Sequence, residues 1–304
     1  MNTQTNQIIA HYNSSSVIET NFMDAGLESN VVLVQLSDGT SAIVKSPKPN
    51  RRPNYIFESD AYRKLSALGA RVPTVLYADE QSLVMSVLAG GELDNHPELY
   101  SDKLLFQDIA GNLALCWQVE YDGFGPIDID SYRNTKAILG KFPTWSAFLN
   151  ETEQLFDPLA KSGQLEHQTV DNLSRYWSKY KNSFDIAKGR LIHGDFAMSA
   201  VFVESDKYSG LIDFGDAIIG DPLMDLAYFK FKEINKDYGT TTFSNLVKPY
   251  IELTKAEEIS NFGTRINLYM IYWGLHRVLD CPEPELIPKF AAKLQVVADG
   301  LDLA

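Results

Sequence analysis

Residues 190–228 read RLIHGDFAMSAVFVESDKYSGLIDFGDAIIGDPLMDLAY, and this stretch carries the most informative pattern in the chain. Two short apolar runs each lead into an acidic residue close to a glycine: Asp195 in HGD and Asp213 in DFGD. The apolar run at 201–203 is typical of a short buried strand, and residues 207–210 carry a turn signal. We therefore expect a small hairpin with one aspartate at each edge, both pointing into one cleft.

These two carboxylates suit two different tasks in phosphoryl transfer. One carboxylate orients a hydroxyl group and takes its proton, while the other holds a metal ion that neutralises phosphate oxygens. We assign the first task to Asp195. Asp213 directly follows a predicted buried strand and is a rigid anchor for Mg²⁺, which takes oxygen ligands and often only one or two carboxylates. A lone HGD would more simply be a loop aspartate that caps a turn, so the interpretation depends on the combination of motifs.

The combination resembles the aminoglycoside phosphotransferase and choline kinase superfamily, the small-molecule kinases of the protein-kinase-like fold. Its signature is HGD, a metal-binding Asn or His five residues after that Asp, IDFGD or IDWE, and then GDP with a further Asp. The chain has HGD at 193–195, IDFGD at 212–216 and GDP at 220–222, followed by Asp225. His193 and Asp225 are expected to be supporting residues, with Asp225 bracing the catalytic loop through hydrogen bonds.

The chain departs from this signature at Ala200, which stands where the family has its metal-binding Asn or His. A methyl group cannot ligate a metal ion. Three explanations are open: a change introduced deliberately to trap a complex, the use of water or Ser199 as the ligand, or a drift from catalysis toward binding. Because the rest of the signature is intact, we expect slow turnover and a gain in rate on changing Ala200 to Asn.

The segment before this stretch carries a candidate nucleotide site. Lys45 ends a predicted strand in AIVK, and Glu58 lies on the predicted helix that follows. A lysine at a strand end is usually solvated. The order of the two residues nevertheless resembles the kinase pair in which the lysine contacts the α- and β-phosphates and the glutamate holds the lysine in place.

Two further segments complete the expected nucleotide site. Gly26 and Ser29 lie where the family has its nucleotide loop. They suit this task because glycine lets the backbone bend and because a hydroxyl with neighbouring N–H groups can meet phosphates. Residues 85–88 are expected to link the two lobes. Backbone groups there, including those of Val87, would bind an adenine or guanine ring while Met85 guards its inner edge. An ordinary strand end is the alternative, and both ATP and GTP fit.

The hydrophobic pattern changes character at Gly90-Gly91. We expect an α+β, two-lobed, protein-kinase-like fold: an N-terminal nucleotide-binding lobe at 1–88, a small antiparallel sheet with one helix, and a larger, mainly helical C-terminal lobe at 89–304 that carries the catalytic loop at 190–228. Expected strands cover 31–36, 41–45, 75–78 and 82–87. Expected helices cover 55–68, 104–120, 144–159, 168–187, 229–236, 242–253, 255–279 and 287–301.

The acceptor site is expected in the helical lobe, whose sequence is the least patterned. Aromatic and basic residues recur there at helical spacing, and they either line a pocket or pack in the core. They are Tyr269, Tyr272, Trp273, His276 and Arg277. An aminoglycoside or other antibiotic, a sugar, an amino alcohol and a biosynthetic intermediate are all compatible acceptors.

Composition limits the possible partners. The formal net charge of the 304 residues is −13, which disfavours nucleic acid and an anionic membrane. Two cysteines, Cys116 and Cys281, indicate no disulfide framework. The first residues lack a basic segment followed by an apolar one, and no apolar stretch is long enough to span a bilayer, so we expect a cytoplasmic protein. The oligomeric state is left open.

These features predict a Mg²⁺-dependent small-molecule kinase that transfers the γ-phosphoryl group of ATP or GTP to a hydroxyl, with Asp195 as catalytic base. The alternative is a catalytically impaired, pseudokinase-like protein that binds a nucleotide or metabolite, which Ala200 alone favours. A protein kinase is disfavoured, because the chain has HGD in place of HRD and no activation segment that ends in APE.

Overall fold

A computed structural model describes residues 8–9, 15–23, 28–255 and 261–302 of the chain. The chain forms two compact units. The first unit comprises Met1–Asn95 and Ser199–Ala217, and the second comprises His96–Met198 and Ile218–Ala304. The hairpin inside the central stretch therefore belongs to the first unit. A lobe boundary between residues 88 and 89 stays a prediction.

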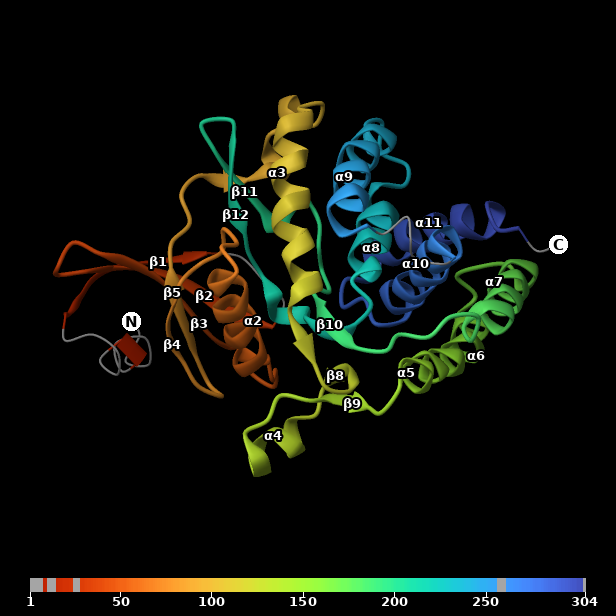
Figure 1. Cartoon of the computed structure of the whole chain (residues 1–304), viewed down its shortest axis with the longest axis horizontal. Helices are drawn as coiled ribbons and strands as arrows, with labels where there is room; N and C mark the ends of the chain where they lie inside the picture. The colour runs from red at the N-terminus through yellow and green to blue at the C-terminus, as the bar shows by residue number, and fades with distance from the viewer. Residues whose placement is uncertain (1–7, 10–14, 24–27, 256–260, 303–304) are drawn as a thin grey trace. The chain divides into compact units, whose positions relative to one another are not determined.

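The first unit is built around a five-stranded antiparallel sheet with the order β1-β2-β3-β5-β4 (Figure 1). Its strands are β1 (Val17–Met23), β2 (Ser29–Leu36), β3 (Ser41–Pro47), β4 (Val75–Ala78) and β5 (Leu83–Ser86). Alternate residues of β2, including Val32 and Val34, are buried in one hydrophobic core, as expected for a sheet with a covered face. Lys45 pairs with Val31 on one side and Leu83 on the other, so it lies in a central strand.

Helix α2 (Tyr55–Ala67) is the one predicted at 55–68. It begins at Asn54, whose side-chain oxygen accepts a hydrogen bond from the Phe57 N–H at 3.1 Å. Its buried face includes Phe57, Ala61 and Leu65, which recur at helical spacing. The apolar spacing in the sequence thus identified this helix and the face that it buries.

A three-stranded sheet with the order β12-β11-β6 completes the first unit. Its strands are β6 (Gly91–Glu92), β11 (Val201–Glu204) and β12 (Lys207–Leu211). The turn predicted over 207–210 is wrong: Ser205 and Asp206 make the turn, with φ values of 49° and 61°. Gly210 lies inside β12, where an added Cβ would come within 2.7 Å of the Leu88 side chain. This glycine marks close packing inside a strand and not a turn.

The second unit holds a further five-stranded antiparallel sheet that the sequence pattern did not predict, in the order β7-β10-β13-β8-β9. Its strands are β7 (Glu120–Tyr121), β8 (Phe124–Ile127), β9 (Gly140–Phe142), β10 (Gly189–Ile192) and β13 (Ile218–Gly220). Runs of two to four residues are too short to show a strand period. The HGD motif, residues 193–195, directly follows β10 of this sheet.

Helices make up most of the second unit, as predicted. They are α3 (Lys103–Ala114), α4 (Ile129–Thr135), α5 (Trp145–Thr152), α6 (Phe156–Ser162), α7 (His167–Tyr180), α8 (Leu223–Glu233), α9 (Gly239–Thr254), α10 (Phe262–Leu279) and α11 (Ile287–Asp299). None of the helices in the described ranges is both long and apolar enough to cross a membrane.

Several predicted helix boundaries are wrong. The helix expected over 104–120 ends at Ala114, because Glu120 pairs with Arg190 in the sheet. The pattern at 144–159 is two helices, and α7 ends at Tyr180 instead of 187. Helix α8 begins six residues before the predicted start at 229, and α10 begins at Phe262. Residues 256–260, which the prediction placed in that last helix, lie outside the described residues.

Candidate active-site residues

Lys45 makes the central ion pairs of the first unit. Its Nζ lies 2.6 Å from Glu58 Oε1 and 2.9 Å from Asp213 Oδ1. The lysine comes from β3, the glutamate from α2 and the aspartate from the segment after β12, and we call these three residues the Lys45 cluster. Burial alone would lower the pKa of Lys45, but the two carboxylates outweigh burial and hold this pKa well above its ordinary value. The lysine therefore stays positively charged.

Asp213 is the exposed member of the Lys45 cluster. Its side chain is 54% exposed, against 10% for Lys45 and 1% for Glu58. Its backbone is left-handed, with φ 67° and ψ 62°, which is uncommon for a residue other than glycine. The Asp213 N–H donates a hydrogen bond of 2.8 Å to the hydroxyl of the buried Tyr62. The Tyr62 ring packs edge-on against Phe214, with ring centroids 5.4 Å apart.

Tyr62 therefore holds the turn that presents Asp213. Sequence reasoning missed this residue. Its one signal was its position on α2 a single turn after Glu58, which puts both side chains on the same face of the helix.

Position 200 offers no side-chain ligand. Ala200 is buried, and its carbonyl oxygen accepts a hydrogen bond from the Ile212 N–H at 2.9 Å. Across the described ranges, no group of three or more His, Cys, Asp or Glu side chains is arranged to hold a metal ion. Mg²⁺ in phosphate-binding sites takes one or two carboxylates and completes its shell with water and phosphate oxygens. The exposed carboxylate of Asp213 fits one such position, and Ala200 fits none.

Three of the other predicted nucleotide residues, Ser29, Met85 and Val87, lie on or beside the first sheet. The Ser29 hydroxyl is buried and accepts a hydrogen bond of 2.8 Å from the Tyr55 hydroxyl. Met85 is buried on β5 opposite Ile43 of β3, while Val87 lies just beyond the strand and is 43% exposed. Gly26 lies outside the described residues. Met85 and Val87 are thus near the strand that carries Lys45.

In the second unit, Asp225 holds the HGD loop, His193 to Asp195, by its backbone. The fully buried Asp225 carboxylate accepts hydrogen bonds from the His193 N–H at 2.8 Å and the Gly194 N–H at 3.0 Å. Gly194 has a φ of 86°, a conformation that suits glycine. Burial raises the pKa of Asp225 to about 7; the two backbone hydrogen bonds oppose this shift and the charge of Asp195 adds to it. The loop is thereby tied to α8.

Asp195 itself forms an ion pair with Arg277 of α10. Arg277 Nη2 lies 2.5 Å from Asp195 Oδ1, although the residues are 82 positions apart in sequence. The guanidinium also lies over the ring of the buried Tyr228, 5.0 Å from its centroid. The sequence placed Arg277 in a pocket or in the core and gave no signal that it meets Asp195.

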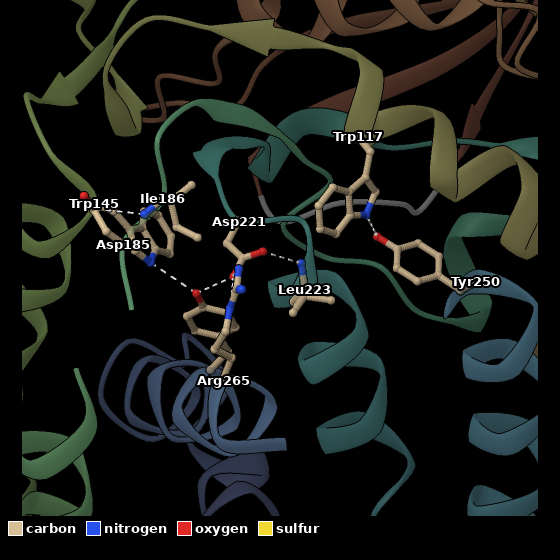
Figure 2. A network of polar contacts seen from close by, with 9 residues as sticks. Trp117, Trp145, Asp185, Ile186, Asp221, Leu223, Tyr250 and Arg265 are labelled. Atoms are coloured by element: carbon tan, nitrogen blue, oxygen red, sulfur yellow. Dashed lines mark hydrogen bonds and ion pairs between the residues drawn. The ribbon is translucent and has the colours of Figure 1, made fainter. Parts of the chain in front are cut away.

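Asp221 of the GDP motif is the centre of a buried network, shown in Figure 2. Its Oδ2 accepts hydrogen bonds from Arg265 Nε at 2.9 Å and from the Tyr269 hydroxyl at 2.6 Å. Its Oδ1 accepts one from the Leu223 N–H at 3.1 Å, and Trp145 Nε1 donates to the Tyr269 hydroxyl at 3.1 Å. All of these side chains are buried, so Tyr269 is a core residue and the network fixes the start of α8 against α5 and α10.

The chain matches a known protein family and several solved structures. Residues 20–253 match the sequence model of a family described as the phosphotransferase enzyme family. Among solved structures, a thermostable mutant of the aminoglycoside phosphotransferase APH(4)-Ia, in ternary complex with ADP and hygromycin B, superimposes with a TM-score of 0.72 at 16% identity. The superposition covers 99% of this chain and 100% of the chain in that structure.

Two other solved structures share the same fold. One is a Thermobifida fusca protein provisionally assigned as a fructosamine-3-kinase, with a TM-score of 0.67, 18% identity and 97% of both chains covered. The other is a macrolide 2'-phosphotransferase type I, with a TM-score of 0.66, 16% identity and 96% of both chains covered. These matches confirm the predicted α+β, kinase-like fold.

Proposed function

Because the chain belongs to the phosphotransferase enzyme family, we propose that it is a Mg²⁺-dependent small-molecule kinase. It would transfer the γ-phosphoryl group of ATP or GTP to a hydroxyl group of a small acceptor. The observation that carries the proposal is the contact of Lys45 with both Glu58 and Asp213. A fixed cation beside a metal-binding carboxylate is what a triphosphate with its metal ion requires.

Lys45 and Glu58 would position the triphosphate. The charged ammonium group of Lys45 meets the phosphate oxygens, and the ion pair with Glu58 keeps that group in place. Asp213 would hold Mg²⁺ through its exposed carboxylate. When bound, the metal ion neutralises charge on the phosphate oxygens. Met85 and Val87 would border the base, and Gly26 and Ser29 would lie near the phosphates.

Asp195 would act on the acceptor. One carboxylate oxygen orients the acceptor hydroxyl and takes its proton as the oxygen forms a bond to the γ-phosphorus. The bond from that phosphorus to the bridging oxygen of the nucleotide breaks in the same transfer, and the nucleoside diphosphate leaves. Asp225 supports this step by holding the backbone of the HGD loop through His193 and Gly194.

The acceptor would carry a hydroxyl group. Hygromycin B is bound by one structural relative, and two others are named for a macrolide and for fructosamine. These acceptors differ widely, so the shared fold is compatible with an aminoglycoside or other antibiotic, a sugar, an amino alcohol or a biosynthetic intermediate.

A second candidate function is favoured by Ala200. If loss of the side-chain ligand at this position abolishes metal binding, the protein is a pseudokinase-like module that binds a nucleotide or metabolite without turnover. The contact of Lys45 with both Glu58 and Asp213 favours the kinase.

The test is a product-mass and phosphate-release screen. The chain and its Ala200→Asn variant are each incubated with ATP or GTP, with and without Mg²⁺, against a panel of hydroxyl-bearing acceptors. We expect a phosphorylated acceptor that forms only with Mg²⁺ and forms faster with the variant. Nucleotide binding with neither hydrolysis nor product in either protein would support the binding module instead.

A further inference from the structure

Arg277 lies in direct contact with the carboxylate to which we assign proton transfer, and nothing in the predicted mechanism uses it. Its Nη2 lies 2.5 Å from Asp195 Oδ1. Within the described residues, the second carboxylate oxygen, Oδ2, accepts no hydrogen bond from the protein. The two oxygens of Asp195 are therefore distinct, one held by a guanidinium and one available to a substrate.

The surroundings of Arg277 fix its guanidinium. Arg277 comes from the last turn of α10, and its guanidinium lies over the ring of Tyr228 on α8, 5.0 Å from the centroid. Tyr228 is fully buried and so presents a rigid face. Stacking on an aromatic face and charge-assisted hydrogen bonding are the two interactions that a planar guanidinium combines best. Because the aromatic platform is rigid, the arginine can hold a carboxylate in one orientation.

The rest of Asp195 is held as well. Its backbone N–H donates to His193 Nδ1 at 3.3 Å, and Asp225 binds the two preceding N–H groups. These interactions fix the position of the Asp195 backbone, but they do not restrain the rotation of its side chain. Arg277 supplies the missing restraint, because it engages the carboxylate itself.

Stability does not account for this contact. The two side chains are 26% and 37% exposed, and an ion pair at such a surface contributes only about 0–1 kcal/mol to stability. A pair of this kind can still matter for catalysis, because a misplacement of about 1 Å can cost roughly 100-fold in rate.

We propose that Arg277 is a positioning residue for Asp195: it binds Oδ1 so that Oδ2 faces the acceptor hydroxyl. This inference rests on the proposed function, because it assumes that Asp195 orients the hydroxyl. It assigns to Arg277 a role in the turnover step and none in holding the nucleotide.

The test compares Arg277→Gln, Arg277→Lys and Arg277→Ala with a matched control, Arg175→Gln. Arg175 is an exposed arginine of α7 that hydrogen-bonds Asn172. Each protein is assayed for kcat and KM of acceptor and nucleotide, for nucleotide affinity, and for melting temperature. The Arg277→Ala protein is also assayed with added methylguanidinium.

We expect Arg277→Gln to lower kcat by about 10- to 100-fold with nucleotide affinity and melting temperature unchanged. Arg277→Lys should keep more activity than Arg277→Gln, since lysine restores the charge without the planar geometry. Methylguanidinium should restore part of the kcat of Arg277→Ala. A purely structural role would not produce this rescue.

Three results would overturn the inference: a kcat of Arg277→Gln equal to that of Arg175→Gln, a loss confined to the KM of the acceptor, or no rescue by methylguanidinium. Loss of folding in Arg277→Gln would leave Arg277→Lys and the rescue as the deciding measurements. Absence of transfer by the unmutated chain and by Ala200→Asn would overturn the proposed function together with this inference. Activity that is indifferent to Arg277 would overturn the inference alone.

Discussion

The Lys45 cluster of the first unit and the HGD loop of the second unit are held by different forces. In the Lys45 cluster, one buried ammonium group binds two carboxylates from distant parts of the sequence. In the HGD loop, one buried carboxylate binds two backbone N–H groups, and the exposed carboxylate of Asp195 pairs with Arg277. The first arrangement depends on charge balance between side chains, and the second on the path of the backbone.

This difference matches the tasks that we propose for the two groups. A triphosphate brings several negative charges, so its site needs a fixed positive charge more than a fixed shape. An acceptor hydroxyl is neutral, so its site needs a carboxylate at the right place and angle. Substitutions should accordingly affect the two groups in different ways.

The largest effect on stability is expected from Lys45→Met. This change leaves the buried Glu58 carboxylate without its main counter-charge, and breaking such a pair typically costs about 3–5 kcal/mol. Adding Glu58→Gln removes the stranded charge and should recover much of the loss. Urea unfolding of the unmutated chain, the two single variants and the double variant gives the coupling free energy between Lys45 and Glu58.

Lys64→Met is the matched control. Lys64 pairs with Asp60 at 3.2 Å on the partly exposed face of α2, where an ion pair four residues apart contributes about 0.3–0.5 kcal/mol. If the Lys45→Met and Glu58→Gln losses simply add in the double variant, charge balance does not hold the Lys45 cluster and the comparison fails.

A smaller effect with a clear pH signature is expected from Asp225→Asn. The pKa of Asp225 in the folded protein is about 7, above its ordinary value in an unfolded chain. The folded state therefore binds more protons than the unfolded state between about pH 4 and 7. The Asp225 carboxyl consequently makes the free energy of unfolding fall as pH rises through this window, by up to ~1.4 kcal/mol per pH unit.

Asp225→Asn should remove this contribution, so its stability should fall less steeply over the same range. Urea unfolding across the window, with the exposed Asp130→Asn as a control, measures the difference. Equal slopes for the unmutated protein and Asp225→Asn would show that this carboxyl is not the buried, proton-binding group described here.

The smallest effect is expected from Tyr62→Phe, which deletes one hydroxyl from the support of Asp213. Loss of the hydrogen bond from the Asp213 N–H should cost about 1 kcal/mol of stability. Because that turn presents the exposed carboxylate, nucleotide binding should weaken more in the presence of Mg²⁺ than in its absence. Calorimetric titration with ATP under both conditions tests this.

Tyr77→Phe is the control for that experiment, since the hydroxyl of Tyr77 on β4 donates a hydrogen bond of 2.7 Å to Asp79 Oδ2. A Mg²⁺-dependent loss of equal size in both variants would mean that Tyr62 does not act through Asp213.

The sequence predicted those parts of the fold that have a period or a motif. A run of apolar residues at 31–36 located β2, and helical spacing located α2. The turn at 207–210 was wrong because Gly210 serves close packing, which only the folded neighbours reveal. The short strands of the second unit escaped prediction because two to four residues carry no period.

The residues of the candidate site likewise fall into those that the sequence predicted and those that it missed. The motifs singled out Asp195, Asp213 and Asp225, because glycine and aspartate stand there in fixed order. Tyr62 and Arg277 belong to no motif, and each meets its aspartate through helix packing across a long separation in sequence. Contacts of that kind follow from the path of the whole chain and have no local signal.

The proposed phosphoryl transfer is tested most directly by following the isotopically labelled γ-phosphoryl group of ATP, with an acceptor found in the screen. The unmutated chain or its Ala200→Asn variant is compared with the same protein carrying Asp195→Asn. We predict that the label appears on the acceptor, and that Asp195→Asn lowers the transfer rate by roughly 100- to 10,000-fold while nucleotide affinity is unchanged. Undiminished transfer by Asp195→Asn would contradict the proposed role of Asp195, and no labelled product from any of the proteins would contradict the proposed kinase activity.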